Sequence, residues 1–159
     1  MIYTKILRPI LFRFNPETIH HVIISILKIF FSIPFSKRLF LHATELNDPR
    51  LKRHLFGLDF SNPVGFAAGF DKNAEVYNEL ASFGFSHIEI GTVTPKGQKG
   101  NPKPRLFRLP ADKGLINRMG FNNHGLEAAI IRLKKRRTTT IIGGYIGKNT
   151  ATPNTTAVN

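Results

Sequence analysis

Three short apolar segments alternate with two amphipathic ones over residues 63–147, and this alternation constrains the fold more than any other feature of the chain. Residues 63–69, 87–93 and 140–147 have the length and composition of buried strands. Residues 73–83 and 123–135 have helical periodicity, and Gly84 follows the first helix as a C-cap. Strands and helices in this order predict parallel β/α units and therefore an α/β fold.

Two other segments predict smaller elements. Residues 55–60 are typical of a hairpin that turns at Gly57. Residues 95–122 form a long loop with paired pieces around residues 105–109. A loop of this length inside a compact domain is usually functional.

The first forty residues differ from the rest, because they are rich in Ile, Leu and Phe and carry six Lys or Arg residues against a single acid, Glu17. Residues 3–14 place apolar side chains at helical spacing, and Pro9 predicts a kink or a late helix start. Asn15-Pro16-Glu17 has the order of a helix opening: an N-cap, a proline at the first position and an acid in the first turn. We expect the second helix to cover residues 16–32 and to end before Pro34.

These two helices are open to two interpretations. Polar residues interrupt the second one, so no stretch approaches the ~18 continuous apolar residues that a membrane span requires. The cleavage pattern of a secretory signal is also missing. Short, basic, apolar helices either lie on a bilayer surface or pack as an α-hairpin on the protein's own core. The pattern alone leaves both possibilities open.

Charge limits the classes of partner. The formal net charge of +13 suits nucleic acid, an anionic membrane surface or a phosphorylated ligand. The basic run at residues 134–137 ends a predicted helix, where cations complement the dipole, and no recognition pattern accompanies it. We therefore expect no nucleic-acid partner. The chain has no cysteine, which excludes disulfides and a thiolate zinc site, and we assign no residue to a metal.

Functional residues of α/β proteins lie at the carboxyl ends of the strands, and all three predicted ends are unusual. Residues 67–72 read AAGFDK, residues 91–95 read GTVTP, and residues 146–149 read IGKN. The long loop adds Asn117, which offers a donor and an acceptor, and Arg118, which could meet a carboxylate. Together these groups suit a flat, anionic, amide-rich ligand. A flavin fits this description, and so do other ligands.

Residues 62–72, 88–95, 104–109 and 117–123 closely resemble the FMN-dependent dihydroorotate dehydrogenases, and the stretch NRMGFNN at residues 117–123 is highly specific. With the N-terminal helices included, the chain resembles the membrane-associated class that uses a quinone. The resemblance implies the N-terminal part of a (β/α)8 TIM barrel, preceded by a two-helix membrane-associating extension. Residues 1–46 would form the extension and residues 47–159 about three β/α units of the barrel.

The resemblance also implies an activity and its residues. FMN would oxidise dihydroorotate to orotate in pyrimidine synthesis, and a membrane quinone would reoxidise the flavin. FMN contacts would come from Ala68, Gly69, Phe70, Asp71, Lys72 and Thr92. Substrate contacts would come from Lys72, Asn117, Arg118, Met119, Gly120 and Phe121. His20 and Arg108 would form the quinone site.

Two departures from the family pattern matter. Tyr145 stands where the family usually has an FMN-contacting asparagine, so that contact is not carried over. The serine base is expected beyond Asn159, so we expect a fragment that is inactive alone, with Val64, Phe66, Ile88 and Ile90 facing an incomplete barrel interior.

No transit peptide precedes the helices, which predicts a bacterial enzyme held peripherally on the cytoplasmic face of the inner membrane. The alternative hypothesis is a non-catalytic, basic, membrane-surface binding protein with a partial β/α fold.

Overall fold

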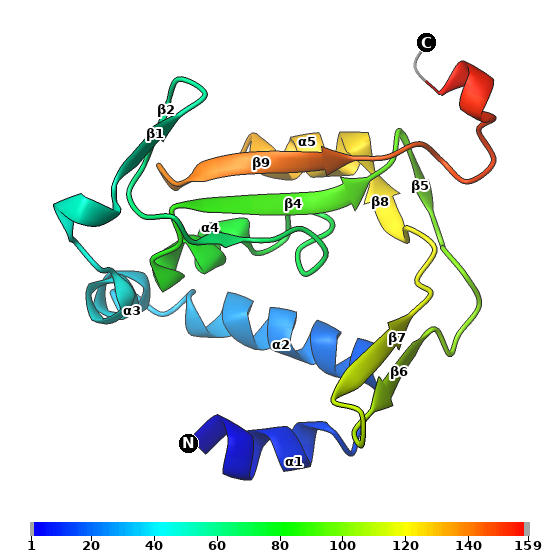
Figure 1. The fold of residues 1–159 in the computed structure, drawn as a ribbon, viewed down its shortest axis with the longest axis horizontal. Helices are drawn as coiled ribbons and strands as arrows, with labels where there is room; N and C mark the ends of the chain where they lie inside the picture. Colours follow the sequence, from blue (N-terminus) through cyan, green and yellow to red (C-terminus); the bar gives the residue numbers. More distant parts are fainter. Residues whose placement is uncertain (1, 158–159) are drawn as a thin grey trace.

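The centre of the molecule is a parallel sheet of three strands. The computed structural model describes residues 2–157. The sheet has the order β3-β4-β9, formed by β3 (Gly65–Phe66), β4 (His87–Val93) and β9 (Ile141–Ile146). Both pairings are parallel, with Gly65 opposite His87 and His87 opposite Ile141. The predicted α/β order is confirmed, with β4 as the middle strand, and Figure 1 shows β4 beside β9.

Two helices and β4 share one apolar core. These helices are α4 (Tyr77–Leu80), continued by the 3-10 turn Ala81–Phe83, and α5 (Leu126–Leu133). The buried cluster contains Tyr77, Leu80, Ile88, Ile90, Val93 and Ala129. The Tyr77 hydroxyl donates to the carbonyl oxygen of Arg132 at 3.0 Å and so ties α4 to α5. This core holds the strands in place, so that the carboxyl ends of β3 and β4 meet at one edge of the sheet.

The expected direction of the strand side chains was wrong. Ile88 and Ile90 are buried in the cluster with Tyr77 and Leu80, and Phe66 packs against that cluster. Side chains alternate along a strand, so the opposite face of β4 carries the half-buried His87 and Glu89. Val64 precedes β3 and is 55% exposed. An error of one residue in register reverses every side chain of a strand, and only the packing partners determine which face is covered.

Both predicted helices of the α/β part begin later than expected. The carboxylate of Asp71 accepts hydrogen bonds from the backbone N–H groups of Glu75 at 2.6 Å and Val76 at 2.8 Å. Ala74 has φ of 56°, which is incompatible with a helix at that point. Gly84 has φ of 79° and closes this segment as predicted.

The long loop contains paired strands. The predicted hairpin is confirmed, and two further antiparallel pairs lie within residues 96–125. The pairs are β1 (Arg53–Leu55) with β2 (Leu58–Phe60), β5 (Lys96–Gln98) with β8 (Asn123–Gly125), and β6 (Leu106–Leu109) with β7 (Gly114–Asn117). Residues 123–125 therefore belong to a strand, and this pairing delays the start of α5 to Leu126. Short 3-10 turns occupy Pro49–Leu51 and Asn154–Thr156.

The N-terminal region has one helix more than predicted. A π-helical turn (Tyr3–Leu7) leads into α1 (Arg8–Leu11), followed by α2 (Pro16–Phe30) and the unpredicted α3 (Ser36–Thr44). The Asn15 side chain accepts from the N–H groups of Glu17 and Thr18, as expected of an N-cap.

The helices α2 and α3 pack on the α/β part. The ring centroids of Phe40 and Phe83 lie 4.7 Å apart, and Phe31 is buried beside them. Ion pairs of 2.7 Å join Lys28 to Glu75 and Lys37 to Glu79. The two helices therefore form a layer on the protein's own core (Figure 1).

The first helical turns, Tyr3–Leu7 and α1, are exposed. No residue of Tyr3–Leu7 or α1 is buried, and Figure 1 shows α1 farther from the sheet than α2. Exposed apolar side chains there are Ile2, Tyr3, Ile6, Leu7, Ile10, Phe12 and Phe14. Within residues 2–157, none of the helices combines the length and the apolar character needed to cross a bilayer.

Candidate functional site

Two adjoining pockets lie at the carboxyl ends of β3 and β4. The first, here the strand-end pocket, has a volume of about 540 Å³ and is lined by Ala67, Ala68, Gly69, Lys72, Glu89, Thr92, Asn117, Arg118, Met119, Gly120, Phe121 and Tyr145. The second, here the helix-side pocket, has about 390 Å³ and lies between α2 and the strand ends, with His20, Phe70, Asp71, Lys72, Leu106, Arg108 and Leu115 in its wall. The two pockets share Gly69, Lys72, Asn117 and Met119.

Small side chains give the strand-end pocket its shape. Ala67, Ala68 and Gly69 carry no atom beyond Cβ, so a planar ligand can approach the backbone closely. Gly69 has φ of 112°, and its N–H donates to the carbonyl oxygen of Gly91 at 2.8 Å. A Cβ on Gly91 would overlap the carbonyl oxygen of Tyr145 on β9. The two glycines thus keep the strand ends close together and their rim flat.

Lys72 lies between the pockets. Its Nζ donates to Oδ1 of Asn122 at 2.8 Å, and its side chain is half-buried. Burial lowers the pKa of Lys72, and the nearby Arg105 charge lowers it further. A partly desolvated cation stabilises negative charge more strongly than one in water. Lys72 is therefore placed to act on an anionic group in either pocket.

Hydrogen bonds between side chains and the backbone hold residues 117–121 at the strand-end pocket. Oδ1 of Asn117 accepts from the N–H of Met119 at 2.9 Å. Gln98 Nε2 donates to the carbonyl oxygens of Gly120 at 3.2 Å and Phe121 at 3.3 Å. The buried Asn123 donates to the Phe121 carbonyl oxygen at 2.7 Å and also bonds Thr94 at the end of β4. The sequence motif is thus fixed relative to the strand ends.

The Arg118 side chain is not in the position that its expected contact with the substrate requires. Its Nη2 donates to the carbonyl oxygen of Pro104 at 3.0 Å, and its guanidinium lies 5.6 Å from the centroid of the Phe107 ring. The side chain is thus directed at the β6 region, although the residue borders the strand-end pocket. A carboxylate contact from Arg118 would require its side chain to move.

Of the predicted FMN contacts, four lie together. Ala68, Gly69, Lys72 and Thr92 border the strand-end pocket with Asn117, Met119, Gly120 and Phe121. Phe70 and Asp71 border the helix-side pocket instead. The Asp71 carboxylate is buried and caps the start of α4, and burial raises its pKa against the lowering effect of its backbone hydrogen bonds.

The two predicted quinone residues lie in the helix-side pocket. The rings of His20 and Phe70 meet edge to face, with centroids 4.8 Å apart. Burial lowers the pKa of His20, and the charges of His21 and Lys72 lower it further, against the raising effect of the Glu17 and Glu75 carboxylates. Arg108 donates to the carbonyl oxygens of Phe14 at 2.7 Å and Phe12 at 3.3 Å, and its guanidinium lies 4.3 Å from the centroid of the Phe12 ring. Arg108 therefore fixes the turn between α1 and α2 at the pocket.

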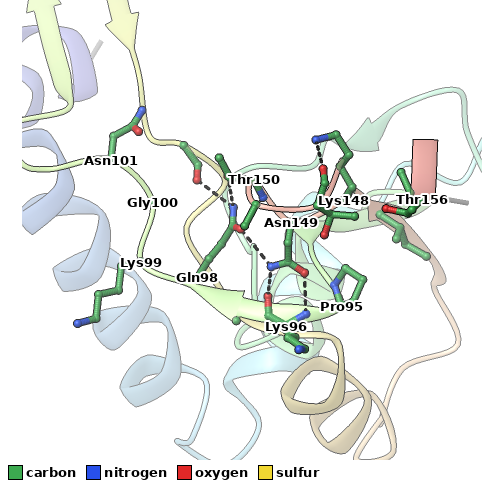
Figure 2. Close-up of a pocket in the computed structure, with 17 residues that line it drawn as sticks. Pro95, Lys96, Gln98, Lys99, Gly100, Asn101, Lys148, Asn149, Thr150 and Thr156 are labelled. Carbon is green, nitrogen blue, oxygen red and sulfur yellow. Dashed lines mark hydrogen bonds between the residues drawn. The ribbon is translucent and has the colours of Figure 1, made fainter. Parts of the chain in front are cut away.

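The third strand end forms a separate polar network. A groove of about 880 Å³ lies between residues 95–101 and 146–152 (Figure 2). Asn149 donates to the Lys96 carbonyl oxygen at 2.6 Å, and its Oδ1 accepts from the Lys96 N–H at 3.0 Å. Oε1 of Gln98 accepts from Asn149 and from the N–H of Thr150, both at 3.1 Å. These amides bond one another, which attaches the segment after β9 to β5.

Tyr145 borders the strand-end pocket from β9 and is 58% exposed. Sequence reasoning overlooked two neighbours of the site, Gln98 and Arg105. Gln98 had no motif to mark it, whereas Arg105 lies in the PRLFRL stretch at residues 104–109 and could have been singled out there.

The fold and the pockets define an α/β protein with a small-ligand site at the carboxyl ends of parallel strands, beside a helical layer. Residues 50–157 match the family model described as dihydroorotate dehydrogenase. The chain belongs to the dihydroorotate dehydrogenase family.

Relatives match nearly the whole chain but only part of their own length. A protein of Christiangramia forsetii named dihydroorotate dehydrogenase (quinone) is 54% identical over 156 residues, which are 98% of this chain and 46% of the relative. A protein of Roseiflexus castenholzii with the same name is 47% identical over 154 residues, which are 96% of this chain and 42% of that relative. The chain therefore spans less than half of the length of these relatives.

A solved structure agrees with this assignment. The Eimeria tenella dihydroorotate dehydrogenase in complex with ferulenol superposes with a TM-score of 0.70 at 40% identity, covering 88% of this chain and 38% of that one.

Proposed function

We propose that this chain forms the N-terminal part of a quinone-dependent dihydroorotate dehydrogenase, which oxidises (S)-dihydroorotate to orotate in pyrimidine synthesis. The observation that carries the proposal is the pair of pockets that share Lys72 and Asn117. One pocket is lined by small residues at the strand ends, and the other lies between α2 and the strand ends, with His20 and Arg108 in its wall. Two ligands can thus bind next to each other, each in contact with Lys72 and Asn117.

The strand-end pocket fits FMN. Ala68, Gly69 and Thr92 leave space against the backbone for a planar ring, and Lys72 supplies a cation beside it. When bound, FMN supplies the two-electron acceptor for the oxidation. Asn117, Met119, Gly120 and Phe121 would hold dihydroorotate and orient it, and the Lys72 ammonium would stabilise its negative charge.

The proton acceptor is proposed to come from outside this chain. Over the described residues, no serine lines the strand-end pocket. The base would therefore belong to the part of the relatives that lies outside the region aligned with this chain. In the same reading, residues 47–159 are the first units of a TIM barrel and residues 1–46 are the extension that associates with the membrane.

The membrane contact is proposed for the first helical turns. Residues 2–14 expose apolar side chains, and Lys5, Arg8 and Arg13 add positive charge next to them. Such a segment binds anionic lipid surfaces in the interface plane. We infer a peripheral location on the cytoplasmic face of the inner membrane, where the helix-side pocket would receive a membrane quinone.

A chimera tests the proposed activity. Residues 1–159 of this chain replace the matching residues of the Christiangramia forsetii protein, which supplies the remainder of the barrel. We expect the purified chimera to retain FMN and to reduce a short-chain ubiquinone with dihydroorotate. The matched control is the unmodified Christiangramia forsetii protein. A chimera that folds and binds lipid vesicles but stays colourless would contradict the proposal and favour a non-catalytic membrane-surface protein.

A deletion in the chimera tests the membrane contact. Removing residues 2–13 is expected to shift the protein from the vesicle pellet to the supernatant, because these residues hold the exposed apolar side chains while α2 stays packed. Flavin content is expected to change little. The control replaces the basic run at residues 134–137 by serine, which removes four positive charges and should leave sedimentation unchanged. Continued pelleting of the deletion variant would show that the first turns are not the anchor.

A further inference from the structure

A buried ion pair joins the helical layer to the α/β part. Arg105 Nη2 lies 2.6 Å from Glu17 Oε1, and Arg105 Nε lies 3.2 Å from Glu17 Oε2. The two side chains are 7% and 8% exposed, whereas Lys103, which also lies 3.3 Å from Glu17, is 66% exposed. The bidentate geometry fixes direction as well as distance. The hydrogen bond from Arg105 keeps the pKa of Glu17 below its ordinary value, so the pair is charged at neutral pH.

The ion pair controls the end of α2 that carries His20. Glu17 is in the first turn of α2, and His20 follows three residues later on the same side of the helix. Both residues line the helix-side pocket. The Lys28–Glu75 pair lies at the other end of α2 and is more exposed, at 45% and 23%. The contact between Glu17 and Arg105 thus holds the first turn of α2, next to His20, whose ring lies against Phe70.

Arg105 also supports the strand-end pocket. Its Nη1 donates to the carbonyl oxygens of Lys99 at 2.6 Å and Asn101 at 3.0 Å. Asn101 in turn donates from its side chain to the Arg118 carbonyl oxygen at 2.8 Å, and from its N–H to the Met119 carbonyl oxygen at 3.0 Å. The Arg118 N–H donates to the carbonyl oxygen of Arg105 at 2.9 Å. One guanidinium thus holds the turn that positions residues 118–120.

We propose that Arg105 is a positioning residue for both pockets, and that Glu17 is a positioning residue for the helix-side pocket alone. Arg105 joins α2 to the loop over the strand-end pocket, so the two ligand sites keep a fixed relation to each other. This inference rests on the proposed function, because it assigns the quinone to one pocket and dihydroorotate to the other.

The test separates the two half-reactions in the chimera. Bleaching of the flavin by dihydroorotate without oxygen reports on the strand-end pocket, and reoxidation by a short-chain ubiquinone reports on the helix-side pocket. We expect Glu17→Gln to raise the half-saturating quinone concentration about tenfold, since a charged buried hydrogen bond is weakened. The dihydroorotate dependence of bleaching should stay within about twofold, since its supporting contacts remain.

Two further variants complete the pattern. Asn101→Ala is expected to raise the half-saturating dihydroorotate concentration about fivefold and leave the quinone reaction unchanged, because it removes one neutral hydrogen bond of the loop. Arg105→Met is expected to impair both half-reactions. Lys37→Met is the control on the neighbouring helix α3, and it should change neither, because a partly exposed ion pair contributes little and neither Lys37 nor Glu79 lines either pocket.

A second readout does not depend on turnover. Amide hydrogen exchange in the first turns of α2 should accelerate in Glu17→Gln and stay unchanged in Lys37→Met. If Arg105→Met fails to fold, the opposite effects of Glu17→Gln and Asn101→Ala still decide the matter. Equal effects of Glu17→Gln on both half-reactions, or no effect on either, would overturn the inference. An unmodified chimera that retains flavin but does not react with dihydroorotate would instead contradict the proposed function.

Discussion

Replacing Lys72 by methionine in the chimera is expected to lower the rate of dihydroorotate oxidation by about a hundred- to thousandfold, the usual cost of removing one preorganised electrostatic contact. Lys72 and Arg118 are the basic residues that line the strand-end pocket over the described chain, and the Arg118 guanidinium is directed at Pro104. Methionine keeps most of the side-chain volume and removes the charge. Steady-state kcat and KM, normalised to bound flavin, measure the effect.

The matched control is Lys96→Met, at an exposed position on β5 away from the strand-end pocket. It should leave the rate unchanged. The pH dependence adds a check with a defined sign. Lys72 is charged below its pKa, and burial lowers that pKa. Activity that needs the charge should therefore fall with rising pH, and at a lower pH than the pKa of an ordinary lysine, which is about 10.4. A Lys72→Met variant with normal turnover would remove the lysine from the mechanism.

The 159-residue chain expressed alone is expected to carry no flavin and to oxidise no dihydroorotate. Within residues 2–157, β9 pairs with β4 only, so its other edge is open. Tyr145 and Ile146 near that edge are 58% and 67% exposed, and the sheet face that carries His87 and Glu89 is only partly covered. An open strand edge with apolar side chains promotes association with other chains. The remainder of the proposed barrel would cover the same residues.

Size-exclusion chromatography and the visible absorption spectrum test this expectation, with the chimera as the control. The isolated chain should elute as aggregate or as an expanded species and remain colourless. A soluble, monomeric, yellow preparation of residues 1–159 would contradict it, because the flavin site would then be complete without further strands.

Local sequence signals predicted the elements whose causes are local. The sequence Asn15-Pro16-Glu17 correctly predicted the start of α2, and Gly84 correctly marked the end of the segment that contains α4. The β1–β2 hairpin and β4 also lie where they were expected. Elements that depend on distant partners were missed or misplaced. The helix α3 packs Phe40 on Phe83, and the delayed start of α5 follows from the pairing of Asn123 with Gln98.

The candidate site divides in the same way. Its residue types followed from the motifs, because glycine, lysine and asparagine at strand ends already suit a flat anionic ligand. The division into two pockets did not, since Phe70 and Asp71 border only the helix-side pocket, whereas Gly69 and Lys72 on either side of them border both pockets. Residues that are neighbours in one sequence motif can therefore border different pockets.

The sequence by itself therefore determined the α/β class, the order of the parallel strands and the helices between them, and the family, because periodicity, capping residues and motifs are properties of neighbouring positions. The tertiary structure alone decided which face of β4 is covered, where the Arg118 guanidinium lies and how Arg105 joins α2 to the strand-end pocket. Each of these depends on groups far apart in the chain, such as Glu17 and Arg105, which are 88 residues apart. Such contacts form only when the packing of the core brings the groups within a few ångströms of each other, and no local pattern specifies them.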